Sequence, residues 1–148
     1  MRMVNRREAL ALGAGALAAA ASIAPAQAAN DAADLIKKFT GGKAAAEGRI
    51  KLDLPEIAEN GNTVPMTVSV ESPMSEQSYV TEVLVVGEGN PNGGMATFHF
   101  SPASGAAEAN TRIRLAASQN IIAVAKMNDG SFFTATKPVK VTIGGCGG

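Results

Sequence analysis

The residues best suited to chemistry are the last five of the chain, Gly144-Gly145-Cys146-Gly147-Gly148. The thiol is the only functional side chain in this segment, and glycines supply none of the apolar neighbours that bury a structural cysteine. Glycine has no Cβ and wide backbone freedom, so the segment 144–148 is predicted to be a flexible arm. Its sulfur could reach about 10 Å beyond Ile143.

A thiolate can form a covalent S–S bond to a small group, and a slender glycine stem would let the loaded sulfur enter a narrow cleft. No Lys, Arg or His adjoins Cys146, so nothing in the segment favours the thiolate. A solvated thiol is mostly protonated at neutral pH, and the activating base is therefore expected from partner enzymes. The pattern predicts a carrier of a covalent substrate rather than an enzyme, with Cys146 as the attachment point and no catalytic residues.

Other interpretations of the cysteine remain open. The chain could be a non-catalytic interaction module whose Cys146 forms an intersubunit disulfide, or the cysteine could be incidental in a Gly-rich tail. A thiol oxidoreductase normally has C-x-x-C, whereas this chain has one Cys. Prenylation needs three residues after the cysteine, and only two follow it. A terminal Gly-Gly is also typical of ubiquitin-like sulfur carriers, but their ATP-dependent activation is cytoplasmic, which an export signal argues against.

Residues 1–28 have the pattern of a bacterial export signal. A basic start with Arg6 and Arg7 precedes an uncharged Ala-, Gly- and Leu-rich stretch, and Ala26-Gln27-Ala28 is an A-x-A cleavage pattern. The paired arginines favour the twin-arginine route for folded proteins, with an ordinary signal as the alternative. A transmembrane helix is a weaker interpretation, because the stretch is rich in Ala and Gly and contains Pro25. The expected location is the periplasm.

Composition excludes several classes of function. The chain has 13 basic and 13 acidic residues, and this balance disfavours nucleic acid or a membrane surface as a partner. One Cys and one His cannot form a Cys-rich or multi-histidine metal site. We therefore expect no metal and no cofactor. His99 lies between Phe98 and Phe100 on an expected strand, so it is predicted to face the surface.

The segment 29–143 is predicted to be one all-β domain with a short N-terminal helix. Helical spacing covers 31–40, with Asp31 as a possible cap and Gly41-Gly42 as the end. Beyond Arg49 apolar residues recur with a period of two, separated by Pro, Gly and Asn turns, which indicates an immunoglobulin-like antiparallel β-sandwich with a β-barrel as the alternative. The expected strands are 49–54, 64–70, 80–86, 95–100, 111–115, 120–127, 131–136 and 138–143.

Three motifs together carry a resemblance to a known family. They are the Gly-Gly-Cys-Gly-Gly segment at 144–148, Pro-Glu-Ile-Ala-Glu-Asn-Gly at 55–61, and Thr-Val-Pro-Met-Thr-Val-Ser-Val at 63–70; the twin-arginine leader fits as well. With these motifs the chain resembles the SoxY family, the sulfur-carrying subunits of the periplasmic thiosulfate-oxidising (Sox) system. The resemblance extends over most of the chain after the leader.

The resemblance implies a fold, partners and a covalent intermediate. The family is an immunoglobulin-like sandwich that forms a heterodimer with a SoxZ subunit. Cys146 would hold thiosulfate and later intermediates, first as a cysteine S-thiosulfonate. A haem-containing enzyme would load the carrier, a hydrolase would release sulfate, and a sulfane dehydrogenase would oxidise the remaining sulfur. The carrier itself would hold no haem or metal.

Overall fold

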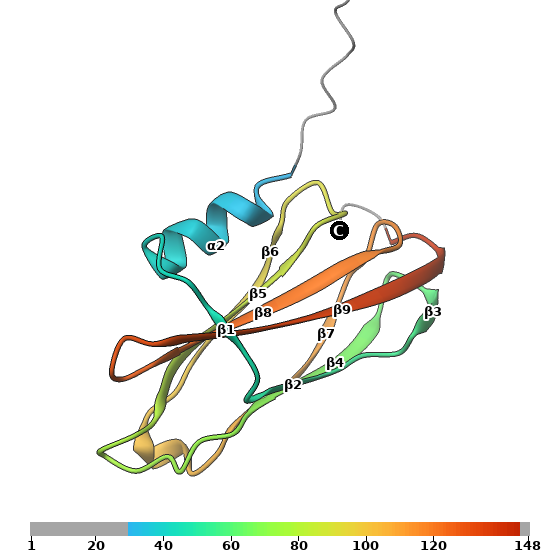
Figure 1. Cartoon of the computed structure of the whole chain (residues 1–148). Coiled ribbons are helices and arrows are strands. Elements are labelled where there is room, and N and C mark those ends of the chain that lie inside the picture. The colour runs from blue at the N-terminus through green and yellow to red at the C-terminus, as the bar shows by residue number, and fades with distance from the viewer. Residues whose placement is uncertain (1–29, 146–148) are drawn as a thin grey trace, which may run out of the picture.

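The computed structural model of the chain describes residues 30–145, which form two β-sheets packed face to face (Figure 1). One sheet has six strands in the order β1-β9-β8-β5-β6, with β3 also paired to β9, and the other has the order β2-β4-β7. The predicted all-β, immunoglobulin-like sandwich with a short N-terminal helix is therefore confirmed. The elements are α2 (Ala32–Thr40), β1 (Ala46–Glu47), β2 (Ile50–Asp53), β3 (Ile57–Asn60), β4 (Val64–Val70), β5 (Val80–Gly87), β6 (Gly94–His99), η1 (Pro102–Ser104), β7 (Ala107–Ile113), β8 (Gln119–Met127) and β9 (Phe132–Ile143).

The core lies between the two sheets and follows from the period of two. Alternate residues of β4 are buried while the residues between them are exposed or half-buried. Pro65 is the second residue of this strand, and β2 pairs with β4 only from Thr67 to Val70, so the missing proline N–H removes no bond to β2. The buried residues of β4 are Val64, Met66, Val68 and Val70.

Helix α2 covers the outer face of the large sheet. Leu35, Ile36 and Phe39 pack against Leu84 and Val86 of β5, so β5 is apolar on both faces. The predicted helix therefore exists and ends at Gly41 as expected. Asp31 makes no side-chain bond that caps it.

The strands differ from the prediction in their bounds, their number and the direction of some pairings. The expected loop 101–110 already enters β7 at Ala107, and the two expected strands after residue 130 form one long strand, β9. The short strands β1 and β3 were not predicted, and both pair with β9 in parallel rather than antiparallel fashion. Pro138 fits within β9 because it lies between the stretches paired with β1 and β3, where its missing N–H removes no bond from that edge.

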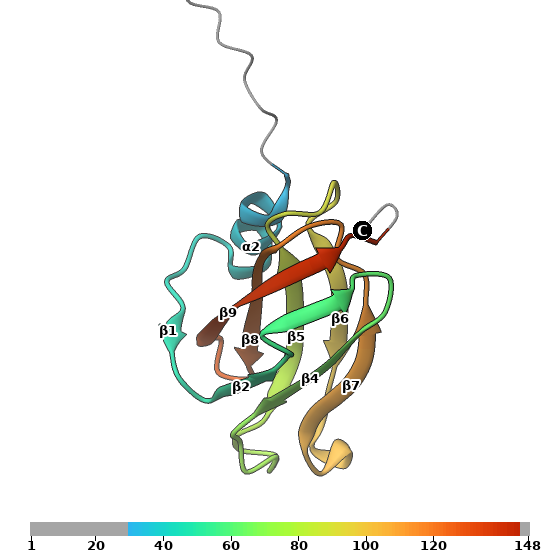
Figure 2. The same cartoon turned by 90° about the vertical axis from the view of Figure 1, so that its right-hand side faces the viewer.

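The sandwich has two ends that differ in their connections. At the tail end lie the turn 60–62, the β5–β6 loop 88–93, the β7–β8 loop 114–118 and the C-terminal segment after β9 (Figure 2). At the far end lie the segment 71–79, η1 and the β8–β9 turn 128–131. Strand β8 runs from one end to the other.

Candidate functional site

The structure describes only the beginning of the predicted carrier arm. Cys146, Gly147 and Gly148 lie outside the described residues, as do Arg6 and Arg7 of the predicted export signal. Gly144 is exposed and Gly145 is buried. The geometry of the candidate site is therefore that of the chain immediately before the cysteine.

Three backbone hydrogen bonds fasten this segment to the tail end. The N–H of Gly61 donates to the carbonyl oxygen of Ile143 at 2.7 Å, and the N–H of Leu115 donates to the carbonyl oxygen of Gly61 at 2.8 Å. The N–H of Gly145 then donates to the carbonyl oxygen of Leu115 at 2.8 Å. We call Gly61, Leu115, Ile143, Gly144 and Gly145 the glycine latch. It anchors the residue that is covalently joined to Cys146.

The three glycines of the latch are required by close backbone approach. A Cβ atom on Gly145 would lie 2.7 Å from the carbonyl oxygen of Gly61, and a Cβ on Gly61 would lie 2.8 Å from the nitrogen of Gly145 and overlap the carbonyl oxygen of Leu115. A Cβ on Gly144 would overlap the carbonyl oxygen of Ala116. The sequence predicted a flexible segment from residue 144, whereas the structure holds residues 144 and 145 against the fold.

A buried asparagine holds the β7–β8 loop that the latch uses. Asn90, only 3% exposed, donates from Nδ2 to the carbonyl oxygen of Arg114 at 2.8 Å. Its Oδ1 accepts from the N–H of Ala116 at 2.9 Å, so one amide bonds to the residues on both sides of Leu115. We call such a pair of bonds from one side-chain amide a bracket. The same Oδ1 accepts from Nε2 of Gln119 at 2.7 Å. Asn90 thus joins the β5–β6 loop to the loop that carries Leu115.

The first described residues secure the β5–β6 loop from its other side. Asn30 donates from Nδ2 to the carbonyl oxygens of Gly87 at 2.6 Å and of Asn90 at 2.9 Å. The side chain of Asp31, predicted as a possible helix cap, instead accepts from the N–H of Gly93 at 2.6 Å. The start of the domain, the β5–β6 loop and the latch therefore form one connected set of hydrogen bonds.

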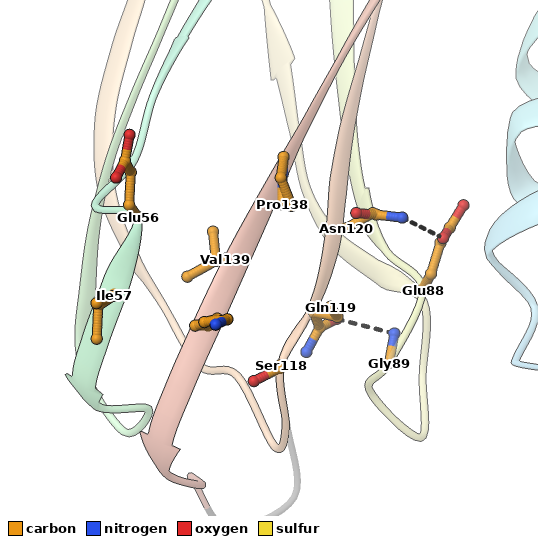
Figure 3. Close-up of a pocket in the computed structure, with 10 residues that line it drawn as sticks. Glu56, Ile57, Glu88, Gly89, Ser118, Gln119, Asn120, Pro138 and Val139 are labelled. Atoms are coloured by element: carbon orange, nitrogen blue, oxygen red, sulfur yellow. Dashed lines mark hydrogen bonds between the residues drawn. The ribbon is translucent and has the colours of Figure 1, made fainter.

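A shallow hollow of about 700 Å³ opens beside these loops (Figure 3). Strand β9 forms its floor, with Glu56 on one side and Glu88 on the other, and Lys140 adds a positive charge. The rim is fixed by two bonds, from Gly89 N–H to Oε1 of Gln119 at 3.0 Å and from Asn120 to Glu88 at 3.2 Å. The hollow presents charged and polar groups on an open surface beside the latch.

The groups that form the latch are peptide groups, and the side chain of Asn90 that supports it is an amide. Neither kind of group gains or loses a proton near neutral pH, so the latch can position the next residue but cannot activate a thiol. Among residues 30–145 there is no group of three His, Cys, Asp or Glu side chains arranged for a metal ion. In the same range no helix is long and apolar enough to cross a membrane. His99 lies on the surface, as predicted, and its Nδ1 is 3.2 Å from a carboxylate oxygen of Glu82.

Sequence reasoning did not find Gly61, Leu115 or Asn90 as parts of the site. Gly61 enters the sequence analysis only as the last residue of the motif 55–61, and Leu115 and Asn90 have no functional role in it. The bonds that unite them join residues far apart in the chain, for instance Asn90 to the β7–β8 loop across 24 residues. No local spacing signals a contact of this kind.

The comparisons with known proteins agree with the β-sandwich fold and with the family resemblance of the sequence. A family model described as "Sulfur oxidation protein SoxY" matches residues 36–146. The SoxY sulfur carrier protein from Chlorobium limicola f thiosulfatophilum has a similar structure, with 30% sequence identity and a TM-score of 0.62, covering 73% of this chain and 89% of that one. No curated protein sequence matches this chain significantly.

Structures of another class share only the fold. A superoxide reductase (neelaredoxin) from Ignicoccus hospitalis is 20% identical with a TM-score of 0.57, covering 64% of this chain and 80% of that one. A superoxide reductase from Nanoarchaeum equitans is 12% identical with a TM-score of 0.56, covering 66% of this chain and all of that one (100%). Identities this low carry the β-sandwich architecture to this chain and nothing about its chemistry.

Proposed function

The chain belongs to the SoxY family of sulfur oxidation proteins, and on this premise we propose that Cys146 covalently holds thiosulfate-derived intermediates for other enzymes. The observation that carries the proposal is the anchoring of Gly145, the residue before the cysteine, by the glycine latch. The family match ends at residue 146, so it includes the cysteine together with every residue of the latch.

The proposed loading step is a two-electron oxidation. The thiol of Cys146 and thiosulfate join through a new S–S bond, the thiol proton is released, and two electrons pass to a haem-containing partner enzyme. The product is a cysteine S-thiosulfonate. A hydrolase then uses water to release sulfate and leaves a persulfide, whose outer sulfur a sulfane dehydrogenase oxidises. Each enzyme supplies the acid, base or electron acceptor that the latch does not contain.

The cellular setting is part of the same proposal. The leader with Arg6 and Arg7 directs the folded chain to the periplasm, where a SoxZ-like subunit forms a heterodimer with it. Export in the folded state suits a partner that has no signal of its own. The carrier needs no metal or cofactor, because the partner enzymes supply the redox groups.

The variant Cys146→Ser tests the proposal. It should abolish thiosulfate-dependent turnover in a reconstituted system, because a hydroxyl cannot form the S–S bond. Its circular dichroism spectrum and melting temperature should match those of the unmodified protein. Full turnover with Cys146→Ser would refute the carrier role. A disulfide-linked dimer on non-reducing gels, with no small-molecule adduct, would instead support the interaction-module alternative.

A further inference from the structure

We propose that Asn90 is a positioning residue for Gly145, the residue before the carrier cysteine, and acts through Leu115. The inference rests on the proposed function, since it assigns a role in presenting the carrier cysteine. It starts from an asparagine that is almost fully buried in the β5–β6 loop, 56 residues before the cysteine in sequence (146 − 90). Every described buried side-chain polar atom has a hydrogen-bond partner, and those of Asn90 converge on one short stretch of backbone.

The side-chain amide of Asn90 binds the backbone of residues 114–116 as a neighbouring strand would. Its Nδ2 donates to the carbonyl oxygen of Arg114, and its Oδ1 accepts from the N–H of Ala116. These two groups flank Leu115 and face the same side of the loop. A donor and an acceptor presented together in this way fix both the position and the rotation of the backbone between them.

The opposite side of the same stretch holds the C-terminal segment. The N–H of Leu115 donates to Gly61, and its carbonyl oxygen accepts from Gly145. The backbone of residues 114–116 therefore has hydrogen bonds on both sides, like a stretch of a central strand. The amide of Asn90 therefore fixes the backbone around Leu115, and the carbonyl oxygen of Leu115 in turn holds the N–H of Gly145.

Burial makes the contribution of Asn90 hard to replace. Leu115 is 0% exposed and Asn90 3% exposed, and both bonds of the amide are partly buried. Removal of the amide would leave a donor on Ala116 and an acceptor on Arg114 without their partner. Unsatisfied buried groups of this kind are unfavourable, and the loop would move to satisfy them. Any such movement shifts the carbonyl oxygen that holds Gly145.

The anchoring of Gly145 limits where partner enzymes meet the thiol. Consecutive Cα atoms are about 3.8 Å apart, so the cysteine is one residue step from an anchored amide. With Gly144 and Gly145 held against the fold, two of the five residues of the arm are already ordered. Less ordering is then needed each time a partner enzyme binds it.

The test compares Asn90→Ala with Asn128→Ala. Asn128 brackets residues 77–79 at the far end with the same pair of amide bonds and provides a matched control. In Asn90→Ala the amide of Gly145 should exchange its hydrogen at least about tenfold faster, while that of the core residue Val124 should change much less. Asn128→Ala should leave the exchange rate of Gly145 unchanged.

Loading kinetics provide the readout that a purely structural role would not change. With the haem-containing loading enzyme, Asn90→Ala should raise the KM for the carrier about tenfold or more at similar kcat, because two freed residues must be ordered on binding. The comparison is made with Ile121→Val, a core variant, at temperatures well below both melting points. A KM unchanged in Asn90→Ala, or raised equally in Ile121→Val, would overturn the positioning role while the carrier role stands.

A milder variant keeps the proposal testable if Asn90→Ala fails to fold. Asn90→Asp retains the acceptor for Ala116 and loses the donor to Arg114. It should give an intermediate increase in both the exchange rate of Gly145 and the KM. If it folds and leaves both values at those of the unmodified protein, the proposal is wrong.

Discussion

Two asparagines, Asn90 and Asn128, bracket a loop in the same way at the two ends of the sandwich. Each donates from Nδ2 to one carbonyl oxygen and accepts at Oδ1 from the N–H two residues later. Asn90 is buried at the tail end, and its bracket supports the chain that leads to Cys146. Asn128 is exposed at the far end, where its bracket only secures the segment 71–79 against a turn.

The difference shows where the fold depends on buried polar contacts. An exposed bracket can be replaced by water at small loss, whereas a buried one holds its loop in a single arrangement. At the tail end the buried bracket adjoins three glycines that no other residue could replace without a shift of the backbone. This concentration of constraint lies immediately before the cysteine in the chain, as the proposed positioning role of Asn90 requires.

The largest expected effect comes from Gly61→Ala at the tail end. The added methyl group would overlap the carbonyl oxygen of Leu115, so the latch must open. Overpacking and the loss of backbone hydrogen bonds should together lower the free energy of unfolding by about 2–4 kcal/mol. Chemical denaturation measures this loss, and hydrogen exchange should show the amide of Gly145 unprotected.

Gly105→Ala at the far end is the matched control for that variant. A methyl group on Gly105 meets no atom within 4 Å, and only its positive φ of 73° opposes the change. The expected loss of stability is about 1–2 kcal/mol, with no change in the exchange of Gly145. Equal deprotection of Gly145 in both variants would contradict the local character of the latch.

The smallest effect is expected at the β8–β9 turn of the far end. The side-chain hydroxyl of Ser131, and then its backbone N–H, donate to Asp129 and lower the pKa of that carboxyl from its ordinary 3.8. A carboxyl whose pKa is lowered by folding stabilises the fold at pH values above its unfolded-state pKa. This stabilisation is lost as the pH falls through its folded-state pKa. The stability difference between the unmodified protein and Asp129→Asn should therefore shrink below about pH 4.

Thermal unfolding of both proteins between pH 7 and pH 2.5 measures this difference. The group is fully exposed, so the difference should be small at every pH. Carrier turnover of Asp129→Asn at neutral pH should equal that of the unmodified protein. Reduced turnover would mean that the two ends of the sandwich are coupled.

Most of the fold could be predicted because burial imposes a period on the sequence. Alternation in 64–70 and the apolar run 80–86 indicated β4 and β5 within one residue of their observed bounds. Strand β1 has two residues, too few for a period, and β3 has one buried residue among four, so it shows no alternation. The pairing of both strands with β9 depends on residues far away in the chain. The sequence offers Asp31 as a possible helix cap, but its side chain bonds to Gly93, a residue that is near it only in the folded structure.

The chemistry of the site stays a prediction from the sequence, and the contacts that support the site were not predicted. A lone cysteine among glycines indicated a covalent carrier from residue types alone. The same glycines were interpreted as flexible, since sequence does not distinguish a glycine chosen for freedom from one chosen for close approach. Gly144 and Gly145 are of the second kind, and their partners, Gly61 and Ala116, lie far away in the sequence.

The mass of the carrier after loading tests the central claim most directly. The unmodified protein and Cys146→Ser would each be incubated with thiosulfate and the oxidised loading enzyme, then analysed by intact-mass and peptide-mass spectrometry. We predict an addition of about 112 Da, the mass of a thiosulfonate group, on Cys146 alone and none on the serine variant. An unmodified Cys146 under conditions of active turnover, or an equal adduct on the serine variant, would contradict the account.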